Sequence, residues 1–301
     1  SDQYFYYYED FVTPSALYFA DASTGTQKLI KSMPAYFDGG KYRVWQHQAV
    51  SKDGTKVPYF VVGPESMKND GSNPTILYAY GGFEVSRIPN YLDDWGRGWL
   101  EKGGVYVLAN IRGGGEFGPR WHQAGLKEKR QNVFDDFYAV SEDLIKLKIT
   151  SPRHLGIMGG SNGGLLMGVA LTQRPDLYRA VVCGAPLLDM QRYSKLLAGA
   201  SWMGEYGDPD ISGEWAYIGK YSPYHNLKKG VEYPEVLFTT STRDDRVHPG
   251  HARKMAARMS EMGLRVLYYE NTEGGHGGSS TNAQTAKRAA LKYAFMLMKL
   301  R

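Results

Sequence analysis

A serine surrounded by glycines is the first group in the sequence that could act as a nucleophile. Ser161 lies in Gly159-Gly160-Ser161-Asn162-Gly163, a G-x-S-x-G pattern between a strand-like and a helix-like run. In this setting the pattern predicts a nucleophile elbow, a sharp strand-to-helix turn that exposes the serine hydroxyl. Glycines suit such a turn because side chains would collide with the next strand and the helix. The alternative is a glycine-rich turn with an incidental serine.

A serine hydroxyl is a weak nucleophile, so it needs a base to take its proton and an acid to orient that base. In chains with this elbow the three residues follow one another as serine, acid and histidine, each after a strand. Asp244 and Asp245 follow one strand-like run, and His276 follows the next. The order and the placement together predict a Ser161–His276–aspartate triad that performs acyl transfer.

Two other patterns predict different chemistry, and both fit the sequence less well. His248 and His251 are alternative bases, but they lie where a helix should begin, ahead of any later acidic partner. As a zinc pair they would need a third ligand.

Glycines 113, 115 and 118 match the G-x-G-x-x-G dinucleotide fingerprint, with Asp135 about twenty residues further on. A polar stretch follows them instead of an apolar helix, so we interpret 113–118 as a loop over the edge of the active site.

The elements that must position these groups alternate between strands and helices. Strand-like runs lie at 57–62, 75–81, 105–111, 154–159, 180–185, 235–241 and 265–270. Helix-like runs lie at 132–149, with Asn132 as the expected N-cap, and at 163–175, 250–263 and 280–300. This alternation predicts a mostly parallel sheet with helices on both faces. The Asp-Gly pair within 51–56 predicts a hairpin, so the sheet should begin antiparallel.

Residues 1–35 have a different pattern. They are rich in Tyr, Phe and Thr, are interrupted by Pro14 and Gly25, and contain no helix-like run. We expect two β-strands joined by a turn. Because two strands alone are only marginally stable, they should pack on the main domain or on a partner.

The overall composition excludes several classes of protein. Of the 301 residues, 42% are hydrophobic and 22% are charged, and no apolar run approaches the length of a membrane span. The first residues do not resemble a signal peptide, so we expect the cytoplasm, with the periplasm as an alternative. The net charge of +5 comes from scattered Lys and Arg, and we expect the basic stretch 126–132 to be solvated surface, which argues against nucleic-acid binding. Cys183 is the single cysteine, which excludes an internal disulfide, and we expect it in the core.

Several separated motifs, all in one order, resemble the catalytic domain of the prolyl oligopeptidases, serine peptidases that cleave after proline. They are YAYGGFEVS, LANIRGGGEFGPRWH, NVFDDF, GGSNGGLLMG, QRPDLY, KYSPYHN, RDDRVHPGHARK and GGHGG. The resemblance runs from about residue 36 to the C-terminus. It implies an α/β-hydrolase fold over 36–301 and catalysis without a metal or an organic cofactor.

The resemblance also implies a role for each matching residue. Ser161 would be the nucleophile, His276 the base and Asp244, the first aspartate of Asp-Asp-Arg-Val, the acid. The Asn162 backbone N–H and the Tyr80 hydroxyl would form the oxyanion hole. The family holds the substrate proline ring in an aromatic slot and hydrogen-bonds a substrate carbonyl. The residues that match this substrate site are Phe83, Leu187, Trp202, Tyr206, Arg246 and Val247.

The family carries a seven-bladed β-propeller that this sequence largely lacks. Residues 1–35 resemble the final strands of its last blade, which implies a fragment, or one piece, of a longer protein. The propeller normally restricts entry to short peptides. We therefore expect two kinds of partner, short peptide substrates and the missing propeller segment of the same protein.

The expected activity is hydrolysis of the peptide bond on the carboxyl side of proline in oligopeptides, through an acyl-enzyme. Each pocket contact contributes only about 1–3 kcal/mol, so a related oligopeptidase of different preference and an esterase stay as alternatives. Arginine selectivity would need an acid in the pocket, and SWMGEYG offers only Glu205, which we expect to face away. A non-catalytic scaffold would typically lack a triad member, and none is missing.

Overall fold

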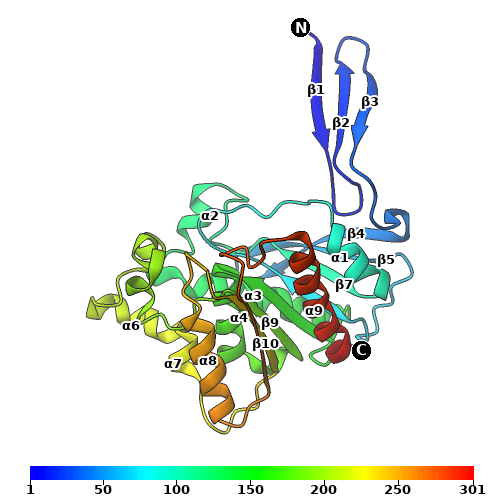
Figure 1. Cartoon of the computed structure of the whole chain (residues 1–301). Coiled ribbons are helices and arrows are strands. Elements are labelled where there is room, and N and C mark those ends of the chain that lie inside the picture. Colours follow the sequence, from blue (N-terminus) through cyan, green and yellow to red (C-terminus); the bar gives the residue numbers. More distant parts are fainter.

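The computed structural model describes all 301 residues and contains two sheets (Figure 1). The larger sheet has eight strands, in the spatial order β11 (Val266–Asn271), β10 (Glu235–Ser241), β9 (Ala180–Gly184), β8 (Leu155–Gly160), β6 (Thr75–Tyr78), β7 (Val105–Ala109), β5 (Lys56–Pro64) and β4 (Tyr42–Val50). Strands β6 to β11 pair in parallel, whereas β5 is antiparallel to both of its neighbours. The expected mostly parallel sheet with an antiparallel start is confirmed.

Helices cover both faces of the larger sheet. They are α1 (Asp93–Gly98), α2 (Pro119–Gln123), α3 (Gln131–Lys146), α4 (Asn162–Gln173), α5 (Met203–Tyr206), α6 (Ser212–Tyr221), α7 (Pro223–Asn226), α8 (Gly250–Glu261) and α9 (Asn282–Leu300). Helices α3, α4 and α8 pack on one face, and α9, with α1 against it, packs on the other (Figure 1). None of the helices combines the length and the apolar character needed to cross a membrane.

The burial pattern of the strands explains this layered arrangement. Val57, Tyr59 and Val61 of β5 face the larger core cluster under α3 and α4, and Val62 faces the smaller cluster under α9. Central strands such as β9 are buried along their whole length because helices cover both of their sides. Cys183 lies in β9 and is buried, as expected of a core cysteine.

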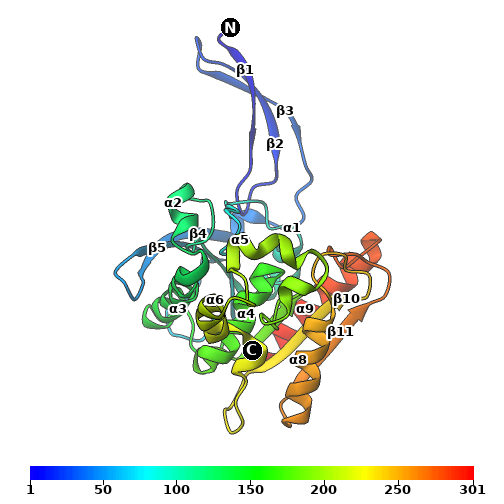
Figure 2. The same cartoon turned by 90° about the vertical axis from the view of Figure 1, so that its left-hand side faces the viewer.

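The N-terminal segment differs from the expectation of two strands. It forms a three-stranded antiparallel sheet of β1 (Gln3–Tyr8), β2 (Ala16–Asp21) and β3 (Thr26–Ser32), which projects away from the rest of the chain (Figures 1 and 2). Both interruptions in the sequence are turns: Asp10 accepts the N–H groups of Val12 and Thr13 before β2, and Gly25 has a φ of +66° before β3. The prediction therefore missed one strand.

The start of α3 also corrects the sequence analysis. The helix begins at Gln131, and Asn132 lies inside it, where its side chain donates to Ala124 O at 3.0 Å instead of capping the helix. The preceding residue, Arg130, is only 1% exposed. The basic stretch 126–132 is therefore not all solvated surface, because its last arginine enters the core.

Candidate active site

The turn between β8 and α4 has the strained geometry expected of a nucleophile elbow. Ser161 adopts φ +58° and ψ −122°, a region that non-glycine residues rarely occupy. A Cβ on Gly164 would lie 2.8 Å from Gly184 O, and one on Gly159 would lie 2.5 Å from Gly163 O. Glycine is required at both positions because the turn, the helix and the neighbouring strand approach so closely.

The structure brings Ser161, His276 and Asp244 together at the carboxyl edge of the sheet. The loop after β10 carries Asp244, and the loop after β11 carries His276. Ser161 Oγ lies 3.1 Å from His276 Nε2, and His276 Nδ1 lies 2.8 Å from Asp244 Oδ2. Asp245, the other carboxylate of this loop, is exposed. The arrangement matches a nucleophile, a base and an orienting acid in hydrogen-bonded series.

The surroundings of Asp244 favour its ionised form. Its side chain is fully buried, which alone would raise its pKa. Hydrogen bonds from His276 and from the backbone N–H groups of Arg246 and Val247, the latter two at 2.9 Å, hold the pKa of Asp244 below its ordinary value. A buried carboxylate that stays charged can fix the His276 Nδ1–H and stabilise an imidazolium.

The two residues expected to form the oxyanion hole lie in the cavity beside Ser161. Asn162 is the first residue of α4, so its backbone N–H has no partner within the helix and lies at the positive end of the helix dipole. Tyr80 lines the same cavity as Ser161. The Asn162 side chain donates to Tyr80 O at 2.6 Å, which ties the two expected donors to each other.

A cavity of about 350 Å³ opens beside Ser161, and aromatic side chains form much of its wall. Its lining residues are Tyr80, Phe83, Val85, Ser161, Asn162, Leu187, Ser201, Trp202, Tyr206 and Arg246. The rings of Phe83 and Tyr206 meet edge to face with centroids 5.7 Å apart, and Tyr206 is fully buried. A small cavity with a partly aromatic wall next to a nucleophile suits one apolar side chain of a substrate.

One expected substrate residue, Val247, does not line this cavity. Its side chain is 2% exposed and belongs to the core, while its backbone N–H binds Asp244. Val85 and Ser201 do line the cavity, although they were not among the residues expected there. Val85 lies within the YAYGGFEVS motif and Ser201 precedes Trp202. Their closeness in sequence to expected site residues could therefore have identified them.

Glu205 does not line the cavity either, as expected, but it is not directed into solvent. Its side chain is buried, and its Oε1 lies 2.7 Å from Nη1 of the equally buried Arg130 side chain. The acid next to the aromatic wall is therefore already paired with a buried cation.

The alternative bases have other roles. His248 Nδ1 accepts the Gly250 N–H at 2.9 Å. His251 is buried, and its Nδ1 accepts the N–H groups of Leu188 and Asp189 at 3.3 and 3.0 Å. Burial lowers the pKa of His251 to about 4, so the ring is neutral near pH 7. His251 thus holds the backbone after β9 and is not placed to activate a nucleophile.

This buried histidine predicts a loss of stability in mild acid. The unfolded histidine binds a proton near its ordinary pKa of about 6.5, whereas the folded one resists protonation until about pH 4. The free energy of unfolding should therefore fall as the pH falls through this window, by about 2 to 3 kcal/mol at pH 4.5 from this group alone. Urea unfolding at pH 7 and pH 4.5 measures the change. In His251→Asn, whose amide oxygen can accept the same N–H bonds, the fall should be smaller, and an equal fall in both proteins would contradict the assignment.

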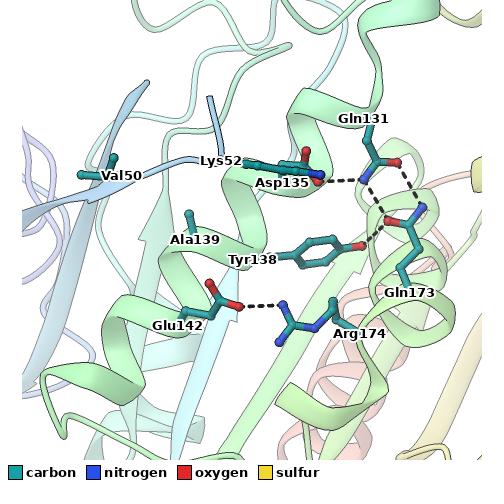
Figure 3. Close-up of a pocket in the computed structure, with 9 residues that line it drawn as sticks. All are labelled: Val50, Lys52, Gln131, Asp135, Tyr138, Ala139, Glu142, Gln173 and Arg174. Atoms are coloured by element: carbon teal, nitrogen blue, oxygen red, sulfur yellow. Dashed lines mark hydrogen bonds and ion pairs between the residues drawn. The ribbon is translucent and has the colours of Figure 1, made fainter. Parts of the chain in front are cut away.

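A second cavity, of about 450 Å³, lies away from the triad beside α3 and α4 (Figure 3). Gln131 and Gln173 exchange amide hydrogen bonds there at 3.0 and 3.1 Å, and Arg174 binds Glu142 at 2.6 Å. Most of its polar side chains bind one another, and its walls contain no serine or cysteine beside a base. The glycines at 113–118 lead only into the five-residue α2, which is consistent with a loop and not with a dinucleotide fold.

The chain is similar to known proteins in sequence and in structure. The model of the prolyl oligopeptidase family matches residues 91–301. The uncharacterized peptidase y4nA of Sinorhizobium fredii is 59% identical over 300 residues, which are 100% of this chain and 41% of that protein. The prolyl endopeptidase of Elizabethkingia meningoseptica is 40% identical over 95% of this chain and 41% of that protein. A solved structure of a post-proline cleaving enzyme from Rickettsia typhi superposes with a TM-score of 0.93 at 43% identity, over 99% of this chain and 45% of that one.

The chain thus spans about two fifths of the length of the curated relatives that it matches. The match extends through the parallel sheet and its helices, which have the α/β-hydrolase fold. On sequence and on structure, this chain belongs to the prolyl oligopeptidase family.

Proposed function

We propose that this chain carries the catalytic centre of a serine peptidase that hydrolyses peptide bonds on the carboxyl side of proline in oligopeptides. The cavity beside Ser161 is the observation that carries the proposal. Its aromatic wall, formed by Phe83, Trp202 and Tyr206, offers flat apolar surfaces to a five-membered ring, and its acidic neighbour Glu205 is paired elsewhere. Relatives described as prolyl endopeptidases and as a post-proline cleaving enzyme support the same assignment.

The proposed reaction uses the three hydrogen-bonded side chains in sequence. Ser161 Oγ attacks the carbonyl carbon of the substrate proline while His276 Nε2 takes the hydroxyl proton, and Asp244 stabilises the resulting imidazolium. The Asn162 N–H and the Tyr80 hydroxyl donate to the oxyanion. His276 then protonates the leaving amine, which departs as the carbon–nitrogen bond breaks. Water attacks the acyl-enzyme by the same route and releases a peptide that ends in proline.

The partners are proposals of the same kind. We infer that residues 1–35 form strands of the last blade of a β-propeller in the same protein, and that residues 36–301 form the catalytic domain. The projecting sheet of β1, β2 and β3 supports this inference, because it exposes apolar side chains such as Tyr7, at 76%, and Phe5, at 63%. Such a surface is unfavourable in water unless another element covers it. Short peptides that fit beneath that cover are the proposed substrates.

A substrate series on the complete protein tests the proposal. Peptides with a chromophoric leaving group and Pro, Ala or Arg at the cleaved position should be compared with a simple ester. We expect kcat/KM for proline to exceed that for alanine by about 10- to 200-fold, because the ring contacts contribute about 1–3 kcal/mol. Faster cleavage after arginine, or hydrolysis of the ester alone, would overturn the assignment.

A further inference from the structure

Glu205 is a buried carboxylate with three donors from three separate segments. Its Oε1 accepts the Phe83 backbone N–H at 2.9 Å and Arg130 Nη1 at 2.7 Å, and its Oε2 lies 2.8 Å from His122 Nε2. A buried charge is costly unless it is paired and hydrogen-bonded, and both oxygens of Glu205 meet that condition. The carboxylate therefore joins the loop after β6, the start of α3 and the short helix α2 at one point.

The Phe83 N–H belongs to a strained turn. Phe83 and Glu84 both have a φ of +57°, a backbone conformation that non-glycine residues rarely adopt. Glu205 holds the Phe83 N–H, and Gly113 O accepts the Glu84 N–H at 3.1 Å. The turn carries the Phe83 ring at one end and begins three residues after Tyr80, so its shape sets both the pocket wall and one expected oxyanion donor.

Arg130, the second partner of Glu205, also contacts Asn162, whose backbone N–H is the other expected oxyanion donor. Arg130 Nη2 donates to Asn162 Oδ1, and the Tyr206 hydroxyl donates to the same oxygen at 2.8 Å. The Arg130 guanidinium also lies over the Tyr206 ring, 5.0 Å from its centroid. A continuous set of contacts thus runs from Glu205 through Arg130 to the first residue of α4 and to the floor of the cavity.

We propose that Glu205 is a positioning residue that holds the Phe83 turn and the Asn162 end of α4 in one rigid unit, and that His122 locks this unit from outside. The proposal rests on the proposed function, because it concerns the same cavity. It gives a role to the glycine-rich segment 113–118, which delivers α2 and hence His122 onto Glu205. Since Glu205 acts through Phe83 and Arg130, its loss should disturb recognition of the substrate ring and stabilisation of the oxyanion together.

The main test is Glu205→Gln in the complete protein. The amide retains the shape but removes the charge that balances buried Arg130, and its NH₂ group cannot accept from His122 or Arg130. We expect kcat/KM for a Gly-Pro-chromophore substrate to fall about ten- to a hundredfold, mostly in kcat, and the ratio of proline to alanine cleavage to fall as well. The matched control is Glu214→Gln, because Glu214 is a half-buried carboxylate that binds only the nearby Asp208 N–H and Tyr217 hydroxyl, at 2.5 and 3.2 Å. The control should retain both the rate and the ratio.

A second pair of variants keeps the test decisive if Glu205→Gln fails to fold. His122→Gln preserves an N–H donor toward Glu205, whereas His122→Leu removes it. We expect the leucine variant to fold but to lose rate and proline preference, and the glutamine variant to recover both. The proposal fails if the leucine variant, or a folded Glu205→Gln protein, keeps its rate and its proline preference within twofold of the wild-type values. The network would then have a purely structural role.

The rate at which a fluorophosphonate labels Ser161 separates this inference from the proposed function. That rate depends on the oxyanion hole but not on a preference for proline. If the wild-type protein fails to cleave after proline, the proposed function fails. Slower labelling of His122→Leu than of His122→Gln would still support the network, and equal labelling would refute it.

Discussion

Replacing Ser161 with alanine should lower kcat for a Gly-Pro-chromophore substrate by about five to six orders of magnitude. In the proposed reaction the hydroxyl 3.1 Å from His276 Nε2 is the attacking group, and the acyl-enzyme cannot form without it. What remains is binding and oxyanion stabilisation, which in serine peptidases supply a residual acceleration of about 10³–10⁴ over water. Substrate affinity should stay close to normal, because the aromatic wall of the cavity is untouched.

The measurement should use the complete protein with Ser260→Ala as the control. Ser260 is exposed near the end of α8, and its loss should change neither kcat nor labelling by a fluorophosphonate. The Ser161 variant should be folded and should form no adduct. Turnover that persists in a pure Ser161→Ala preparation would show that a different group attacks the substrate.

The strand positions were predicted well from the sequence where the chain contains nearly continuous apolar runs. The run 235–241 coincides with β10, and 265–270 differs from β11 by one residue at each end. Strand β10 is buried on both faces, so its composition shows its position directly, whereas β11 is a partly exposed strand at the edge of the sheet. Helix α1 was missed because it has six residues, too few to display a helical period. Its position depends on distant contacts such as the 2.9 Å hydrogen bond from Tyr293 to Asp94.

The sequence was sufficient to predict that Ser161, His276 and Asp244 lie together, because each of them follows a strand of a parallel sheet. The carboxyl ends of such strands meet at one edge, so chain order and strand ends suffice to bring the side chains together. The direction of a single loop side chain is not set in this way. Val247 was expected in the pocket, but its side chain packs in the core, while its backbone N–H binds Asp244.

The pairing of Arg130 with Glu205 lay beyond sequence reasoning. A basic stretch with one acid usually forms a solvated face, and nothing local distinguishes the buried Arg130 from the exposed Lys129 beside it. The partner of Arg130 lies 75 residues away, in a segment that is placed only when the sheet assembles. The same limit applies to any buried charge. Such a charge is tolerated only because it has a partner, and the fold decides which residue that partner is.

Changing Asp244 to asparagine should lower kcat by about four orders of magnitude with little change in the fold. The reason lies in how the two carboxylate oxygens are used. Oδ1 accepts two backbone N–H groups, from Arg246 and Val247, and only Oδ2 faces His276. In the variant the amide oxygen must take the Oδ1 position, so the NH₂ group faces His276 Nδ1.

That orientation forces the wrong tautomer on the base. Nδ1 must then accept a hydrogen bond, which leaves the proton of the neutral imidazole on Nε2, where it cannot receive the Ser161 proton. Steady-state kinetics with Asp245→Asn as the control checks the argument, since Asp245 is exposed and its variant should keep the wild-type rate. If Asp244→Asn retained more than a tenth of the activity while Asp245→Asn lost it, the orienting acid would be Asp245, and the hydrogen bond between His276 and Asp244 would not be the one that functions in catalysis.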